Sequence, residues 1–174
     1  MIKNEILKLF PEPIFKYKFD DYQNFNEELG KYIYDLYEND KEGIQRSNVN
    51  GWHSKNFKIQ KESAPYNFIK SIHGYVKEVM VDGFGWKYNA EKVGITEIWA
   101  IINKKNTFNQ IHNHPNTYLS AAYYVKAPKN CGDIQFHEPN EVKKFRHPVI
   151  EQKNELNSSG FSLKAEEGNL LIFP

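Results

Sequence analysis

Apolar residues recur at helical spacing in two stretches of the first half of the chain. The first stretch, residues 24–38, predicts a helix capped by Asn24, and the second predicts a helix that begins near Ser63. Pro65 suits the first turn of the second helix, and the glycines of VDGFGW should end it. The apolar stripes are Phe25, Leu29, Ile33 and Leu36 in the first helix, and Phe68, Ile69, Ile72, Val76 and Val79 in the second.

Alternating apolar and polar residues predict strands in the rest of the chain. Residues 10–19 contain Pro13, which cannot donate to a ladder, so we expect an edge strand there. Phe57 and Ile59 indicate a short strand within residues 42–61. From residue 88 onward the period is two, and the run 93–103 is long enough for a central strand. The other expected strands are 118–127, 132–139 and two within 161–174, joined by a turn at Glu167-Gly168.

Helices toward the N-terminus and strands toward the C-terminus indicate an α+β chain, in which the strands form a sandwich or a barrel-like pair of sheets. A length of 174 residues fits one domain, with a helical and strand-containing part at 1–87 and a β-rich part at 88–174. Aromatic residues make up 15% of the chain, which is too many for a disordered protein.

Charge and cysteine content exclude several classes of protein. Lysine and arginine total 23 against 22 acidic residues, so the net charge of +1 gives no general reason to bind nucleic acid or an anionic membrane. A single cysteine, Cys131, excludes an internal disulfide and a cysteine-built metal site. No apolar run approaches a membrane span and no signal-peptide core begins the chain, so a cytoplasmic protein is expected. Arg46 and Arg146 are the two candidates for a bidentate anion clamp.

The strongest chemical signal is the pair of histidines in NQIHNHPNTYLSAAYYV. In an extended segment residues i and i+2 project to the same face, so His112 and His114 should direct two imidazoles into one pocket. Two imidazoles are half of a facial site for iron, zinc or copper. Solvated loop histidines are the alternative, and the location of the pair just before a β-rich strand favours the metal site.

Four segments follow one another in an order that is typical of a known family. They are SNVNGWHS (47–54), EIWAIINKKNTFNQIHNHPNTYLSAAYYVKAP (97–128), GDIQFHEP (132–139) and GNLLIFP (168–174). They match a Gly-Trp-His-Ser element, a Trp-x-x-x-Asn strand, a His-x-His-Pro turn that leads to Ser and Tyr-Tyr, and a late Phe-Pro strand. In this combination the chain resembles the putative 2-oxoglutarate/Fe(II)-dependent oxygenase family from about residue 47 onward.

This resemblance implies a double-stranded β-helix, a jelly-roll or cupin-like core, with the N-terminal helices packed on it. His112 and His114 would bind Fe(II), while Ser120, Tyr124 and Asn103 would contact the cosubstrate 2-oxoglutarate. The activity implied is that of a dioxygenase, a hydroxylase that converts 2-oxoglutarate into succinate and CO₂. In the wider superfamily the second residue of the metal motif is a carboxylate, so His114 leaves the ligand set open.

The resemblance also implies that the final strands are missing. In the family the Phe-Pro strand precedes a third metal ligand and a basic residue for 2-oxoglutarate, whereas the printed chain stops at Pro174. We therefore expect either an inactive fragment of a longer oxygenase or a natural chain that has lost catalysis. Of the other histidines, His53 is expected to pack or hydrogen-bond rather than line the pocket. Surface or solvent positions are expected for His73, His137 and His147.

Other functions remain open at this point. The competing class is a cupin-like metal-binding domain or a non-catalytic jelly-roll domain that acts in protein interactions. Cupin sites usually add a glutamate and a further histidine, and the stretch PNTYLSAA contains neither. The sequence does not specify the substrate, a small molecule or a protein, and it is compatible with a homodimer.

Overall fold

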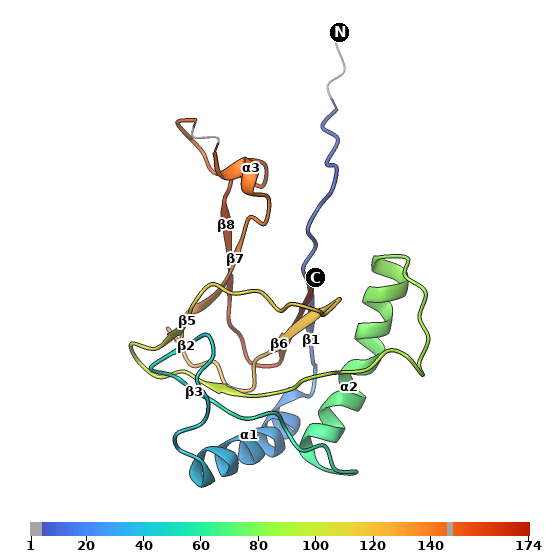
Figure 1. Cartoon of the computed structure of the whole chain (residues 1–174), viewed down its shortest axis with the longest axis vertical. Helices are drawn as coiled ribbons and strands as arrows, with labels where there is room; N and C mark the ends of the chain where they lie inside the picture. Colours follow the sequence, from blue (N-terminus) through green and yellow to red (C-terminus); the bar gives the residue numbers. More distant parts are fainter. Residues whose placement is uncertain (1–4, 146–147) are drawn as a thin grey trace. The chain divides into compact units, whose positions relative to one another are not determined.

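The computed structural model describes residues 5–145 and 148–174 (Figure 1). The chain divides into two compact units, one made of Met1–Lys126 with Glu167–Pro174 and the other of Ala127–Glu166. The helices are α1 (Tyr22–Asn39), α2 (Ala64–Glu78), a turn of π-helix η1 (Val79–Gly83) and α3 (Glu141–Lys144). The strands are β1 (Phe15–Lys18), β2 (Asn48–Val49), β3 (Trp52–His53), β4 (Ile101–Ile102), β5 (Phe108–Asn109), β6 (Ser120–Tyr123), β7 (Asp133–His137), β8 (Gly160–Lys164) and β9 (Asn169–Phe173).

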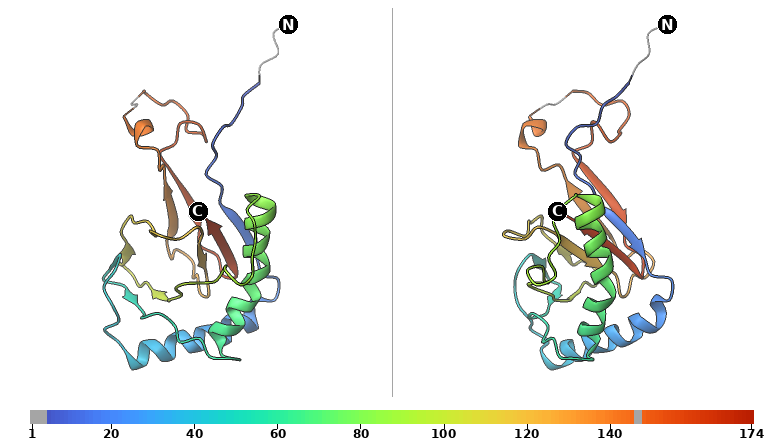
Figure 2. Two further views of the ribbon diagram at one scale, coloured as in Figure 1. Left: turned by 45° about the vertical axis from the view of Figure 1, so that its right-hand side comes forward. Right: turned by 90° about the vertical axis from the view of Figure 1, so that its right-hand side faces the viewer.

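The larger unit is organised around the last strand of the chain. β9 pairs antiparallel with β1 on one side and with β6 on the other, and both views of Figure 2 show α2 alongside this sheet. β1 lies at the edge of the sheet, as its proline-preceded sequence predicted. Leu170 lies in register with Tyr17 of β1 and Tyr123 of β6. The first four residues of β9 are buried, which fits a continuous apolar run in a central strand.

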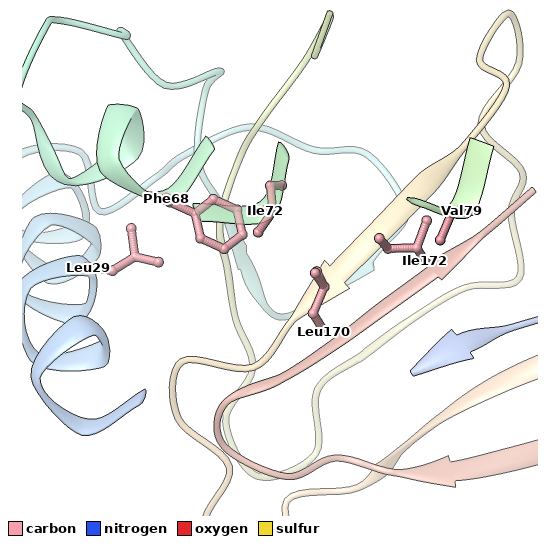
Figure 3. Packing of buried hydrophobic residues seen from close by; sticks show 6 residues of the cluster. All are labelled: Leu29, Phe68, Ile72, Val79, Leu170 and Ile172. Carbon is pink, nitrogen blue, oxygen red and sulfur yellow. The ribbon is translucent and has the colours of Figure 1, made fainter. Parts of the chain in front are cut away.

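Both helices pack on one face of this sheet. Leu29 of α1, Phe68 and Ile72 of α2, and Val79 of η1 form one cluster with Leu170 and Ile172 of β9 (Figure 3). Because side chains alternate along a strand, Leu171 and Asn169 are on the other face of β9, and both are also buried. The sheet therefore contributes to two environments, the helical core and the face that bears Ser120 of β6.

The two expected helices are confirmed, with one different cap. α2 begins after Ser63, whose hydroxyl accepts a hydrogen bond from the backbone amide of Tyr66 at 3.4 Å. α1 begins two residues earlier than expected, so Asp21 is at its N-cap and Asn24 lies within the helix. The expected end near Gly83 is reached through the π-helical turn, which the sequence pattern did not indicate.

Two expected strands of the larger unit are wrong. Residues 93–103 do not form a central strand, since only Ile101 and Ile102 are in a ladder, and β4 pairs with β3 alone. Phe57 and Ile59 are in no strand either, although the amide of Phe57 donates to the carbonyl of Ile98 at 2.8 Å. The two segments run beside each other without forming a ladder at these positions, and residues 94–97 are exposed.

The smaller unit is a hairpin with a short helix. β7 pairs antiparallel with β8, which confirms the expected strand at 132–139. Asp133, Gln135 and His137 are exposed on one face of β7, as expected for a face in solvent. Arg146 and His147 lie outside the described residues.

These ladders confirm an α+β chain, but they do not show the expected jelly roll. Within residues 5–145 and 148–174 the strands form one three-stranded and three two-stranded sheets, and none of them closes into a barrel. No helix in that part of the chain is both long enough and apolar enough to cross a membrane.

Candidate metal centre

The structure places the two histidines of the His-x-His segment side by side. His112 and His114 lie between β5 and β6, and their ring centroids are 5.1 Å apart at an angle of 49°. His112 is exposed, whereas His114 is half-buried. The pair thus stands at the surface with one ring turned toward the protein.

Hydrogen bonds to Nδ1 orient both rings. The Nδ1 of His112 lies 2.7 Å from the carbonyl oxygen of Gln110, and since a carbonyl can only accept, this nitrogen carries the proton. The lone pair of His112 is then on Nε2, the form in which imidazole binds a metal. The Nδ1 of His114 lies 2.8 Å from the hydroxyl oxygen of Ser120, which can donate or accept. Such partners of the second nitrogen are typical of histidines that ligate metals.

A tryptophan and a third histidine continue this row of rings. The indole of Trp99 meets the ring of His114 edge-on, with centroids 5.6 Å apart at 82°. On its other side Trp99 stacks on His53, with centroids 5.6 Å apart at 14°. His53 is only 6% exposed, and its Nδ1 lies 2.7 Å from the carbonyl oxygen of Ser54. The expectation that His53 packs and hydrogen-bonds is met, and its ring partner belongs to the site.

Burial lowers the pKa of two of these histidines. Burial lowers the pKa of His53 below its usual 6.5; the hydrogen bond with the Ser54 carbonyl opposes this effect, and the proximity of Arg46 and His112 adds to it. Burial also lowers the pKa of His114, with His112 adding to the effect and Glu97 opposing it. A neutral imidazole is the form that ligates a metal without first releasing a proton.

The lowered pKa of His53 predicts a pH dependence of stability in the metal-free protein. Below pH 6.5 the unfolded chain takes up a proton on His53 more readily than the folded chain does. The free energy of unfolding should therefore decrease as the pH is lowered. The slope should be at most about 1.4 kcal/mol per pH unit for one such histidine. Urea unfolding at a series of pH values between 5.5 and 7.5 should show a shallower slope for His53→Gln. Parallel curves for the two proteins would contradict this prediction.

The residues predicted to contact 2-oxoglutarate are distributed unevenly around the histidines. Ser120 and Tyr124 are on the face of β6 opposite Tyr123, whose ring enters the helical core. Ser120 contacts His114 directly. Asn103, in contrast, donates from Nδ2 to the Oδ1 of Asn109 at 3.0 Å, so it joins the loop before the site. Their role toward a cosubstrate stays a prediction.

The donor set fits part of an iron site. His112 and His114 offer two imidazole nitrogens, but the described residues contain no group of three or more His, Cys, Asp or Glu side chains placed to hold a metal. Two imidazoles match the histidines of a facial triad, which leaves its third position to a ligand outside this set.

A polar cavity in the larger unit is lined by residues other than the histidines and Trp99. Its volume is about 300 Å³, and its wall includes Trp52, Tyr37 and Lys104. Trp52 precedes His53 in β3, and because neighbours in a strand point to opposite faces, the cavity and the histidine row are on different faces of the β3–β4 ladder. The cavity therefore does not extend the histidine site.

Comparison with known families decides the identity of the segment that holds the two histidines. Residues 97–174 match the family model described as Putative 2OG-Fe(II) oxygenase. This segment, which we call the oxygenase segment, is therefore similar to the family described as Putative 2OG-Fe(II) oxygenase. No curated protein and no solved structure matches the chain. The resemblance seen in the sequence is thus confirmed for the oxygenase segment, which holds Trp99, His112, His114, Ser120 and Tyr124.

The oxygenase match does not include His53, which precedes the matched residues. Sequence reasoning noted the Gly-Trp-His-Ser element but did not connect it with the metal pair. The sequence feature that could have indicated this connection is the Trp-x-x-x-Asn element, because its Trp99 contacts both His53 and His114. Contacts between segments so far apart in the chain are settled only by the fold.

Proposed function

We propose that the protein is a 2-oxoglutarate- and Fe(II)-dependent dioxygenase, which hydroxylates a substrate that the sequence does not specify. The observation that carries the proposal is the pair of adjacent imidazoles, His112 and His114, within the oxygenase segment, each oriented through its Nδ1. His112 and His114 would hold Fe(II) through Nε2, and a third ligand would come from outside the described cluster. The proposal includes a jelly-roll fold, in which the sheet β1-β9-β6 would form part of one of the two layers.

Each nearby residue has a task in this function. Iron and 2-oxoglutarate together supply the oxidising chemistry, and the protein binds and orients them. The carbonyl of Gln110 holds the proton on Nδ1 of His112, so that Nε2 stays available. Ser120 fixes the ring of His114, and the half-buried indole of Trp99 excludes water from one side of that ring. Tyr124 and Ser120 would line the cosubstrate pocket on the face of β6 that is turned away from the helices, with Asn103 at its margin.

An anaerobic titration with Fe(II), followed by oxygen and 2-oxoglutarate, tests the proposal. We expect one Fe(II) per chain, with an affinity that rises when 2-oxoglutarate is present because the cosubstrate chelates the metal. Succinate formation after oxygen is added would support the dioxygenase. Metal binding that does not respond to 2-oxoglutarate would favour a cupin-like metal-binding domain instead. Absence of any metal binding, with or without 2-oxoglutarate, would overturn the proposal.

A further inference from the structure

His53, which stacks on Trp99, is the residue that the proposed function leaves without a role. His53 comes from the Gly-Trp-His-Ser element, which precedes the matched oxygenase residues. It is 6% exposed, and its ring is nearly parallel to the indole of Trp99. The same indole meets His114 edge-on. A buried side chain from one segment is thus linked through a single ring to a candidate ligand in another.

Several hydrogen bonds hold the backbone around this pair of residues. β3 and β4 pair antiparallel, with His53 opposite Ile101. Just beyond the ladder, the amide of Ser54 donates to the carbonyl of Ala100, and the hydroxyl of Ser54 accepts from the amide of Ala100, each at 2.9 Å. Ser54 and Ala100 are both buried. These bonds join the residue after His53 to the residue after Trp99, so the two rings are held in a fixed relation.

The loop between α1 and β2 also packs closely against β3. The amide of Ile44 donates to the carbonyl of His53 at 2.9 Å. Gly43 has a φ of +63°, and a Cβ at this position would lie 2.4 Å from the same carbonyl oxygen. Only glycine accommodates both the positive φ and the close approach. The backbone of His53 is therefore held by both the neighbouring strand and this loop.

We propose that Trp99 and His53 are positioning residues of the metal centre, an inference that rests on the proposed function. The ring of His114 has two restraints, the Ser120 hydroxyl at Nδ1 and the indole of Trp99 against its side. The hydrogen bond holds only the Nδ1 atom, so the imidazole ring could still rotate about the axis of that bond. The indole of Trp99 blocks this rotation. His53 in turn keeps the indole from rotating away. The pair thus aims Nε2 of His114 before a metal arrives, and preorganisation of this kind raises metal affinity.

Nuclear magnetic resonance of the metal-free protein tests the arrangement without reference to iron. The chemical shifts of the His114 ring protons should change when the ring current of the indole is removed in Trp99→Leu. The change should be smaller in His53→Gln, which keeps Trp99 but removes its stacking partner. Trp86→Leu is the matched control, because the rings that Trp86 contacts are those of Phe84 and Tyr118 and not those of the histidine row. Unchanged His114 resonances in Trp99→Leu would overturn the inference.

Cobalt(II), a spectroscopic substitute for Fe(II), tests the consequence for the metal. Removing a partner that orients a ligand typically weakens metal affinity about 10- to 100-fold, so this loss is expected for Trp99→Leu and for His53→Gln. Trp99→Phe keeps an aromatic ring and should restore most of the affinity. The visible absorption bands of bound cobalt should change in Trp99→Leu, which a residue with a purely structural role would not cause. Thermal unfolding of each variant identifies any that fails to fold, and His53→Gln and Trp99→Phe then carry the test.

Failure of this inference and failure of the proposed function give different results. If the parent protein binds cobalt and the Trp99 and His53 variants bind it equally well, the positioning role is wrong and the metal site stands. An equal loss of affinity in Trp86→Leu would also overturn the positioning role, because the effect would then be global. If the parent binds no cobalt, both are wrong, even where the resonances of His114 confirm the contact with Trp99.

Discussion

The double variant His112→Ala/His114→Ala is expected to lose Fe(II) and cobalt(II) binding altogether, and each single variant to lose more than about 100-fold in affinity. That figure is the upper end of what the loss of a ligand's partner costs, and loss of the ligand itself should exceed it. The two rings lie 5.1 Å apart, so removal of either leaves a single imidazole, which holds a divalent metal weakly. Isothermal titration under anaerobic conditions measures the change.

The matched control for this prediction is His137→Ala. His137 is an exposed histidine of β7, in the smaller unit, so the same chemical change is made in a different unit of the chain. Its metal affinity and its response to 2-oxoglutarate should equal those of the parent protein. If His112→Ala and His114→Ala also behave like the parent, any metal bound by the chain is held elsewhere, and the proposed dioxygenase loses its main support.

Leu170→Ala is expected to destabilise the folded protein by about 3–4 kcal/mol, within the range that buried leucines show on truncation. Leu170 is fully buried in β9, between Tyr17 and Tyr123 of the flanking strands, and it packs against both helices (Figure 3). Truncation removes the transfer free energy of the side chain and leaves a cavity that a paired central strand cannot collapse to fill. Urea unfolding followed by far-ultraviolet circular dichroism gives the free energy of unfolding.

Leu156→Ala provides the comparison for the core variant. Leu156 is 59% exposed, so the same truncation should change the free energy of unfolding by no more than about 0.5 kcal/mol. Similar losses in both variants would show that Leu170 is not the core residue that its burial indicates. A small loss at Leu170 would mean that β9 is not the organising strand of the larger unit.

The helices could be read from the sequence because their determinants are local. The apolar stripe of α2 and the Ser63 cap lie within a few residues of one another, and a helix forms its hydrogen bonds within the same segment. The strand at 132–139 was also predicted well, since its partner β8 follows soon after in the same hairpin. In each case the pattern and its partner are close together in the chain.

The long strand expected at 93–103 shows where a local sequence pattern does not predict the structure. Alternation indicates that a segment can be extended, but a strand forms only where a partner completes its ladder. Residues 94–97 are exposed, and only two residues further on, in β4, find a partner in β3. The central place instead goes to β9, a short apolar run at the end of the chain that pairs on both sides. The local sequence pattern specifies neither the pairing of β4 with β3 nor the pairing of β9 with β1 and β6.

The sequence by itself determined the α+β class, the two amphipathic helices and the His112–His114 pair, because each depends on spacing within one segment. It also indicated the oxygenase family through the order of its motifs. Only the tertiary structure decided that β9 is central and that His53 stacks on Trp99, whose indole meets the ring of His114. The physical reason is that pairing and stacking between distant segments depend on which surfaces meet when the chain folds, and periodicity along one segment carries no information about that meeting.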